Sequence, residues 1–210
     1  MIIQKYFNYS FKKNNYEEDF FVNHTNQNAY EISILENFDQ NIFLFGPKKS
    51  GKSFLINLWK NINNAVVYKN NFSEIIKSKY NIAIDDALTS IDQEKLFHII
   101  NHCKLYNLKI YLTSSIDLNN NNFKIKDLRS RLRSFYYLNI KIPDDEMCKM
   151  FMTKLFSKKQ IVIKNKEIFD YIFNRVNRTY FDIYLFIEKI DKLSLEKKRQ
   201  LTIPLIREIL

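Results

Sequence analysis

The only two glycines of this 210-residue chain, Gly46 and Gly51, lie within one short segment. Residues 46–53 read Gly-Pro-Lys-Lys-Ser-Gly-Lys-Ser and fit the pattern G-x-x-x-x-G-K-[ST]. Glycine allows the backbone to approach a ligand closely and to adopt positive φ angles. The backbone N–H groups of such a loop, with the N-terminus of the helix that follows, point at phosphate groups. The segment therefore predicts a phosphate-binding site, which we favour over a plain tight turn.

Two side chains of this loop have specific roles in nucleotide chemistry. Lys52 would place a cation on the β and γ phosphates, and the Ser53 hydroxyl would ligate Mg²⁺. The expected ligand is a nucleoside di- or triphosphate with its magnesium ion. The residues predicted to contact it are Gly46, Pro47, Lys48, Lys49, Ser50, Gly51, Lys52 and Ser53.

A pair of acids supplies the second element that this chemistry needs. The apolar run 82–84 is followed directly by Asp85 and Asp86. Asp85 is expected to hold Mg²⁺, directly or through water, and Asp86 to lie where a water molecule could be polarised. The alternative for Asp85 is a cap on the following loop.

Two further segments carry candidate catalytic side chains. Residues 113–115 follow another apolar run, and the Ser114 hydroxyl is expected to reach the γ-phosphate or the attacking water, unless the segment is an ordinary turn. Arg129, Arg131 and Arg133 are three of only seven arginines in a chain that holds 26 lysines. A planar guanidinium stabilises a transferring phosphoryl group in a way that an ammonium does not match. The alternative for these arginines is a solvated helix face.

The net charge and its distribution say less about function than the phosphate loop does. The formal net charge is +10, which would normally suggest an acidic partner such as nucleic acid. The lysines are scattered along the chain and form no stripe, and AT-rich codons supply lysine in any case. Direct nucleic-acid binding is therefore not favoured on charge alone.

The cysteines, the histidines and the apolar runs indicate the cellular compartment and test for a zinc site. Cys103 and Cys148 are too few for a disulfide framework and fit a reduced, cytoplasmic setting. His98 and His102 stand four positions apart, but no third ligand apart from Cys103 is evident, so a surface helix face is preferred to a zinc site. No apolar run approaches the roughly 20 residues that span a membrane, and residues 1–11 show no secretory signal.

The order of predicted elements indicates an α/β fold. Apolar runs predict strands at 41–45, 65–68, 82–84, 108–112 and 136–142, alternating with helices at 54–62, 72–79, 93–106 and 125–135. This alternation is typical of a parallel sheet with right-handed crossovers. Beyond Pro143 the pattern is all helical, at 144–158, 166–175, 181–193 and 203–210. We therefore expect an α/β subdomain at 1–142 and a helical subdomain at 143–210.

With these motifs in place, the chain resembles the AAA+ module of the bacterial replication initiator DnaA and, more closely, the Hda family of DnaA-related regulators. The likeness covers nearly the whole chain and is carried by residues 16–22, 46–53, 128–132 and 201–210. It implies an AAA+ P-loop five-stranded parallel sheet with a C-terminal helical lid. A DnaA initiator would continue into a helix-turn-helix domain where this chain ends, which favours the Hda branch.

The resemblance implies an adenine nucleotide, ADP or ATP, as the ligand. In the family, the segment before the first strand lines the adenine pocket, and Phe20, Phe21, Val22 and Asn26 match it. Arg131 matches the arginine finger, which in AAA+ assemblies acts on a nucleotide held by a neighbouring subunit. The chain is thus expected to supply a guanidinium in trans, and weak ATPase activity of its own stays open.

The resemblance also implies the partners. Family members bind the sliding clamp of DNA polymerase III through an N-terminal peptide that contains glutamine, and Gln4, Phe7 and Tyr9 match it. The ADP-bound regulator, loaded on the clamp, stimulates hydrolysis of DnaA-bound ATP and so inhibits reinitiation of DNA replication. Contact with DNA is expected to be indirect, through the clamp, and a homodimer is one assembly that the sequence leaves open.

The sequence departs from the family pattern in two places. The lid helix of the family carries a sensor arginine that touches the phosphates, and the matching position here is Phe181, with Arg178 three residues away. The clamp peptide lacks the usual Leu and Pro. An autonomous ATPase of the helicase-loader type, a small P-loop kinase and a DnaA-like adaptor without nucleotide function therefore remain as alternatives to an Hda-like regulator.

Overall fold

A computed structural model of the chain describes residues 20–120, 122–163 and 165–209, and it has a five-stranded sheet at its centre. The strands are β1 (Ile42–Phe45), β2 (Ala65–Val67), β3 (Asn81–Ile84), β4 (Ile110–Ser114) and β5 (Tyr136–Asn139). Their order in the sheet is β2-β3-β4-β1-β5, and every neighbouring pair is parallel. The predicted α/β fold with five parallel strands is confirmed.

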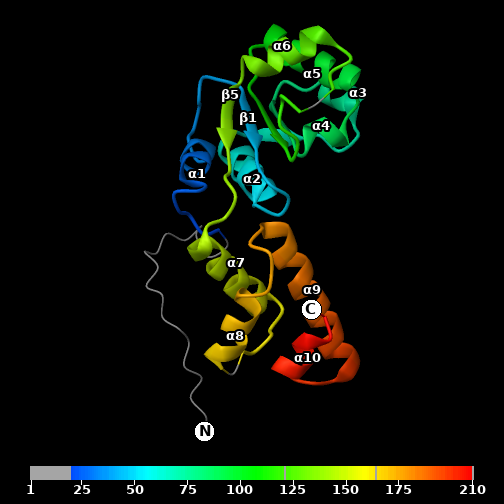
Figure 1. Cartoon of the computed structure of the whole chain (residues 1–210). Coiled ribbons are helices and arrows are strands. Elements are labelled where there is room, and N and C mark those ends of the chain that lie inside the picture. The colour runs from blue at the N-terminus through cyan, green and yellow to red at the C-terminus, as the bar shows by residue number, and fades with distance from the viewer. Residues whose placement is uncertain (1–19, 121, 164, 210) are drawn as a thin grey trace.

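Helices cover both faces of this sheet. The chain begins with α1 (Gln27–Ser33) and continues through α2 (Lys52–Ile62), α3 (Phe72–Ile75), α4 (Ala87–Ser90), α5 (Gln93–Leu105) and α6 (Lys126–Arg133). The helices α1 and α2 share one core cluster with the strands, whereas α3 to α6 share another. Figure 1 shows these layers in the upper part of the molecule.

The alternation of side chains along the strands explains the two clusters. In β1, Ile42 and Leu44 belong to the cluster under α2, whereas Phe43 belongs to the cluster under α5. In β4, Tyr111 and Leu112 divide in the same way. Successive strand residues point to opposite faces, and strands buried on both faces read as continuous apolar runs. The sequence of β1, and of β4 up to Leu112, is therefore a continuous apolar run.

The C-terminal part of the chain forms a separate helical group below the sheet (Figure 1). Its helices are α7 (Asp145–Lys158), α8 (Lys166–Phe173), α9 (Tyr180–Lys197) and α10 (Ile203–Arg207). A third core cluster lies within these helices, while Met147 and Tyr180 join the sheet cluster instead. The Asp144 carboxylate caps α7 by accepting from the Met147 amide at 2.6 Å, and the hydroxyl of Thr179 caps α9.

Several element boundaries differ from the sequence-based prediction. β4 runs through Ser114 rather than ending at residue 112, because parallel pairing with β1 continues to the Phe45–Ser114 pair. α3 ends at Ile75, whereas the prediction extended it to residue 79. The helices α1 and α4 were not predicted, since each is short, at 7 and 4 residues, and neither has a side-chain cap. In the part of the chain that the structure describes, no helix is long and apolar enough to cross a membrane.

Candidate nucleotide site

Three strand ends meet where the phosphate loop begins. The loop at residues 46–53 leaves the carboxyl end of β1, and the Gly46 amide donates to the Ser114 carbonyl of β4 at 3.2 Å. Asp85 follows β3, the other neighbour of β4. Carboxyl ends of parallel strands share one edge of a sheet, which is the usual ligand edge of open α/β folds. The predicted phosphate loop and the predicted acid therefore lie together.

The backbone of the loop takes two left-handed conformations. Lys49 has φ 67° and Gly51 has φ 94°. A Cβ built on Gly51 would lie 2.4 Å from Cε2 of the Phe20 ring, so this glycine is required both by its φ angle and by the ring beside it. The concentration of glycine in this loop thus has a direct steric cause.

Replacing Gly51 with alanine is expected to destabilise the protein. The left-handed conformation costs a side chain about 1–2 kcal/mol, and the clash with Phe20 adds to this. Thermal unfolding of Gly51→Ala should therefore show a lower Tm than the parent protein. In a Phe20→Ala background the clash is absent, so the same substitution should cost less. Equal Tm values for Gly51→Ala and the parent would contradict the described loop.

The Lys52 side chain folds back over the loop. Its ammonium donates to the Gly46 and Pro47 carbonyls, both at 2.9 Å, and the residue is 7% exposed. Burial lowers the pKa of Lys52, against the opposing charges of Asp86 and Asp85. A desolvated ammonium gains from a bound anion, because the anion replaces the hydration that burial removed.

The loop fits a phosphate group on two observations. Within the described residues, the backbone amides of Gly51, Lys52 and Ser53 at the start of α2 have no hydrogen-bond partner in the protein. The Ser50 hydroxyl is buried and also unpartnered. Unsatisfied donors at a helix N-terminus bind anions through both hydrogen bonds and the helix dipole. This geometry can hold a phosphate group, and ligation by residues 46–53 stays a prediction.

Two hydroxyl groups are hydrogen-bonded to the Asp85 carboxylate. The Ser53 hydroxyl donates to Asp85 Oδ2 at 2.6 Å, and the Thr113 hydroxyl donates to Asp85 Oδ1 at 2.5 Å. Magnesium prefers oxygen ligands and usually takes one or two from protein, with waters and phosphate oxygens completing the octahedron. Ser53 and Asp85 fit such a shared role. Among the residues described, no group of three His, Cys, Asp or Glu side chains lies close enough together to hold a metal ion without a bound nucleotide.

Asp86 is held in place by the turn after β4. Its Oδ1 accepts from the Ser115 amide at 2.9 Å and from the Ser115 hydroxyl at 2.7 Å. Burial raises the pKa of Asp86, but the hydrogen bonds from Ser115 and Thr89 and the charge of Lys52 together lower the pKa overall. Asp86 has φ 50°, and its amide donates to the Thr113 hydroxyl at 2.8 Å. The carboxylate is thus a fixed, ionised acceptor at this edge of the sheet.

Ser114 does not reach this edge, which corrects its predicted role. Its hydroxyl is fully buried, donates to the Ile116 carbonyl at 2.8 Å and accepts from the Ile116 amide at 2.9 Å. Because strand side chains alternate, Thr113 shares the α2 face of the sheet with Tyr111, while Ser114 faces the other way. Of these two β4 residues, Thr113 is the one whose hydroxyl contacts Asp85. Extending the predicted strand by two residues would have revealed this.

The segment before α1 lies against the loop. The Phe20 ring stacks on Phe54 of α2 with ring centroids 4.9 Å apart, and Tyr30 of α1 lies 6.0 Å away on a near-parallel plane. The Asn26 side chain donates to the Phe21 carbonyl at 2.8 Å, which fixes the turn. Val22, matched to the adenine pocket by resemblance, is half-buried in the same segment.

The lid approaches the loop through α9. Lys49 Nζ lies 3.9 Å from the centroid of the Tyr184 ring, and Lys48 Nζ lies 5.9 Å from that of Phe181. Figure 1 shows the N-terminal end of α9, in orange, nearest to the phosphate-loop end of α2. Arg178 instead pairs with Asp145 of α7 at 2.6 Å. Tyr184 was missed in the sequence, although it lies one helical turn from Phe181.

Arg131 lies at the other end of the sheet. It belongs to α6, which precedes the amino end of β5, whereas the phosphate loop follows the carboxyl end of β1. Figure 1 shows α6 far from the lid. The Arg131 guanidinium lies over the Phe97 ring of α5, 5.2 Å from its centroid, while Arg129 and Arg133 are exposed. The three arginines are therefore remote from the chain's own phosphate loop.

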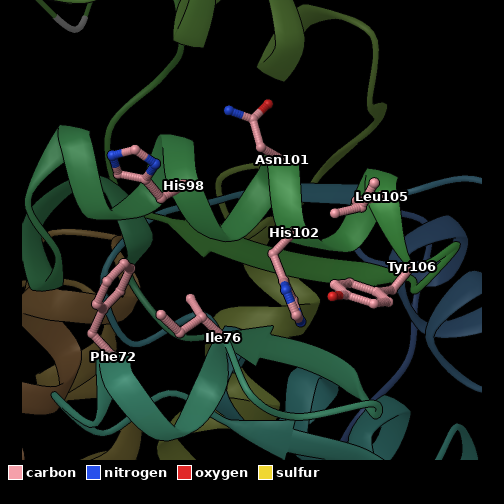
Figure 2. A pocket seen from close by; sticks show the side chains of 7 residues that line it. All are labelled: Phe72, Ile76, His98, Asn101, His102, Leu105 and Tyr106. Atoms are coloured by element: carbon pink, nitrogen blue, oxygen red, sulfur yellow. The ribbon is translucent and has the colours of Figure 1, made fainter.

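A shallow groove between α3 and α5 is separate from the nucleotide site. Its volume is about 490 Å³, and Figure 2 shows the lining side chains of α5 and the residues near α3. The His102 Nε2 is hydrogen-bonded to the Ser78 carbonyl at 2.9 Å, and His98 lies against Phe72 and Phe97. Both histidines thus have packing roles.

Comparison with known proteins defines the class. Residues 147–210 match the family model described as Hda, lid domain. Domain III of Thermotoga maritima DnaA is similar in structure, with a TM-score of 0.72, 18% identity, and coverage of 91% of this chain and 93% of that one. AMPPCP-bound DnaA from Aquifex aeolicus has a TM-score of 0.64 and 21% identity over 85% of this chain. The chain spans 66% of that structure's length.

A second kind of protein is similar over the same region. The Thermotoga maritima RuvB branch-migration motor has a TM-score of 0.59 and 15% identity, covering 86% of this chain and 64% of its own. No curated protein matches the chain by sequence. The fold with its phosphate loop is that of the AAA+ class. The lid match and the DnaA-type fold support a Hda/DnaA-related AAA+ protein.

Proposed function

We propose that this chain is an Hda-like negative regulator of replication initiation that binds adenine nucleotide and promotes hydrolysis of ATP held by DnaA. The observation that carries this proposal is an intact phosphate loop joined to a lid that matches the Hda lid domain. The DnaA structure from Aquifex aeolicus was solved with AMPPCP bound, which supports an adenine nucleotide as the ligand here. Residues 1–142 would hold the nucleotide, and residues 143–210 would close over it.

In the proposed site, each side chain has a defined task. The free amides of α2 and the Lys52 ammonium bind the phosphates. Ser53 and Asp85 hold Mg²⁺, which supplies charge neutralisation at the phosphates. Thr113 positions Asp85 through its hydrogen bond. Phe20 and Val22 face the base. Bound nucleotide is a structural cofactor in this scheme, since α6, which carries Arg129, Arg131 and Arg133, lies away from the phosphate loop.

Arg131 would act on a different protein. An arginine finger works on a phosphoryl group across an interface, and its planar guanidinium stabilises charge that develops during transfer. The position of α6 at the far end of the sheet supports an action in trans. Stacking on Phe97 would limit the conformations of the guanidinium before the partner binds.

The nucleotide that accompanies the purified protein tests this proposal. Mass spectrometry of the nucleotide released on denaturation should find ADP. Release of ADP together with steady ATP turnover by the chain alone would favour the autonomous ATPase instead. No released nucleotide, and no binding of added ADP or ATP, would favour an adaptor without nucleotide function.

Clamp binding is the second part of the proposal. Gln4, Phe7 and Tyr9 lie outside the described residues. In sequence they supply a polar anchor followed by two aromatic anchors, which suits an extended peptide in a clamp pocket. Deleting residues 1–9 is expected to abolish binding to the clamp in a surface-capture assay, with the Tm unchanged. Equal clamp affinity of the truncated and full-length proteins would overturn this assignment.

A further inference from the structure

The phosphate loop and the lid are in contact through cation–π interactions. Two cations, Lys48 and Lys49, project from the loop towards the lid, and the lid presents the aromatic rings of Phe181 and Tyr184 to them. A cation within about 6 Å of a ring centroid is attracted to the ring face. The loop therefore supplies the charge and α9 supplies the π faces.

This contact is continuous along one side of α9. Phe181, Tyr184 and Glu188 are spaced three and four residues apart, so they share a helix face. The Glu188 carboxylate pairs with Lys159 at 2.9 Å, and Lys159 also pairs with Asp191 at 3.0 Å. Hydrogen bonding to Lys159 is the largest cause of the lowered pKa of Glu188, to which Tyr184 and the charge of Lys49 also contribute. Glu188, one turn after Tyr184 on α9, is therefore ionised.

The backbone of Lys49 positions its side chain for this contact. Lys49 has φ 67°, a left-handed conformation in the middle of the loop. The Lys49 ammonium lies 3.9 Å from the Tyr184 centroid, the shorter of the two loop-to-lid distances. Lys52, by contrast, points inwards to the Gly46 and Pro47 carbonyls. The loop thus directs one lysine to the phosphate position and two towards the lid.

We propose that Phe181 and Tyr184 form a latch that holds the lid on the phosphate loop through Lys48 and Lys49, so that lid closure is insensitive to the γ-phosphate. The inference rests on the proposed binding of nucleotide at residues 46–53. The latch closes on charges of the protein itself, which are present with ADP and with ATP alike. Tyr184 and Phe181 are positioning residues in this scheme. Because their rings carry no positive charge, they cannot bind the γ-phosphate, and the lid does not distinguish ATP from ADP.

Calorimetric titration with ADP and with AMPPCP tests the latch. The parent protein should bind the two with similar affinity. Tyr184→Leu should weaken both by the same factor, about 2- to 5-fold, as expected for loss of a half-exposed cation–π contact. Tyr184→Phe keeps the ring face and should bind like the parent. Loss of affinity for AMPPCP alone, or equal affinities of Tyr184→Leu and the parent, would overturn the latch.

Phe181→Arg provides the reverse test. This substitution places a cation where the lid can reach a γ-phosphate, and it removes one ring from the latch. AMPPCP should then bind at least about tenfold more tightly than ADP, since a charge-assisted hydrogen bond is gained with the triphosphate only. Unchanged discrimination would contradict the proposed position of Phe181 over the phosphate loop.

A nucleotide-free measurement separates the latch from the proposed function. In a double-mutant cycle of Lys49→Met and Tyr184→Leu, followed by denaturant unfolding of the nucleotide-free protein, the pair should couple by about 2- to 5-fold in the unfolding equilibrium constant. Lys189→Met on α9 is the control and should show no coupling to Tyr184→Leu. Coupling without nucleotide binding would overturn the proposed function alone, whereas nucleotide binding without coupling would overturn the latch alone.

Discussion

Arg131→Ala is expected to lower the rate of DnaA-bound ATP hydrolysis about 10³- to 10⁵-fold relative to the parent protein, the range that an arginine finger supplies in trans. Its own nucleotide and its clamp binding should be retained, because α6 lies at the end of the sheet away from the phosphate loop. The measurement is single-turnover hydrolysis of ATP preloaded on DnaA, with clamp and DNA present.

Matched controls come from the same helix. Arg129→Ala and Arg133→Ala each remove one exposed arginine of α6 and should lose far less stimulation. Arg131 also packs on Phe97, so the Tm of Arg131→Ala must be compared with that of the parent. Arg131→Lys keeps the charge without the planar fork and should stay well below parent activity. If Arg131→Ala stimulates as well as the parent, the finger assignment fails and the arginines form a solvated or DNA-facing basic patch.

Lys52→Ala is expected to empty the nucleotide site. The substitution removes the buried ammonium and leaves the Gly46 and Pro47 carbonyls without its hydrogen bonds. Each charge-assisted hydrogen bond contributes about 1.5–3 kcal/mol, so the affinity for ADP should fall about 10- to 150-fold for each bond that Lys52 makes to the phosphates. Calorimetric titration with ADP measures this directly, and released nucleotide should be absent from the purified variant.

Lys60→Ala is the matched control for this loss. Lys60 lies in the last turn of the same helix, α2, away from the loop, and its removal should leave ADP affinity at the parent value. Circular dichroism would verify that both variants remain folded. ADP affinity in Lys52→Ala equal to that of the parent would contradict the assignment of residues 46–53 as the phosphate site.

Much of the fold could be predicted because the sequence repeats one simple pattern. Five apolar runs alternate with helical segments, and the runs of β1, β3 and β4 are buried on both faces of a parallel sheet, so these three strands read clearly. The short helices α1 and α4 escaped prediction, because 7 and 4 residues carry little periodicity and neither helix has a capping side chain. Their positions depend on tertiary packing.

The candidate site shows the same division between local and tertiary information. Residues 46–53 and Asp85 can be proposed as a site from the sequence because their motif is local. Ser114 was chosen in place of Thr113 because the end of β4 was placed two residues early, and a strand's side chains alternate between faces. The contact of Tyr184 with Lys49 joins residues that only the folded chain brings together.

The most direct test of the account is the lifetime of ATP on DnaA. DnaA preloaded with ATP would be mixed with DNA-loaded clamp and with this chain in its ADP-bound form, and the remaining ATP followed over a single turnover. The account predicts rapid conversion to ADP only when both the chain and the clamp are present. An ATP lifetime that is the same with and without the chain would contradict the proposed regulation of DnaA.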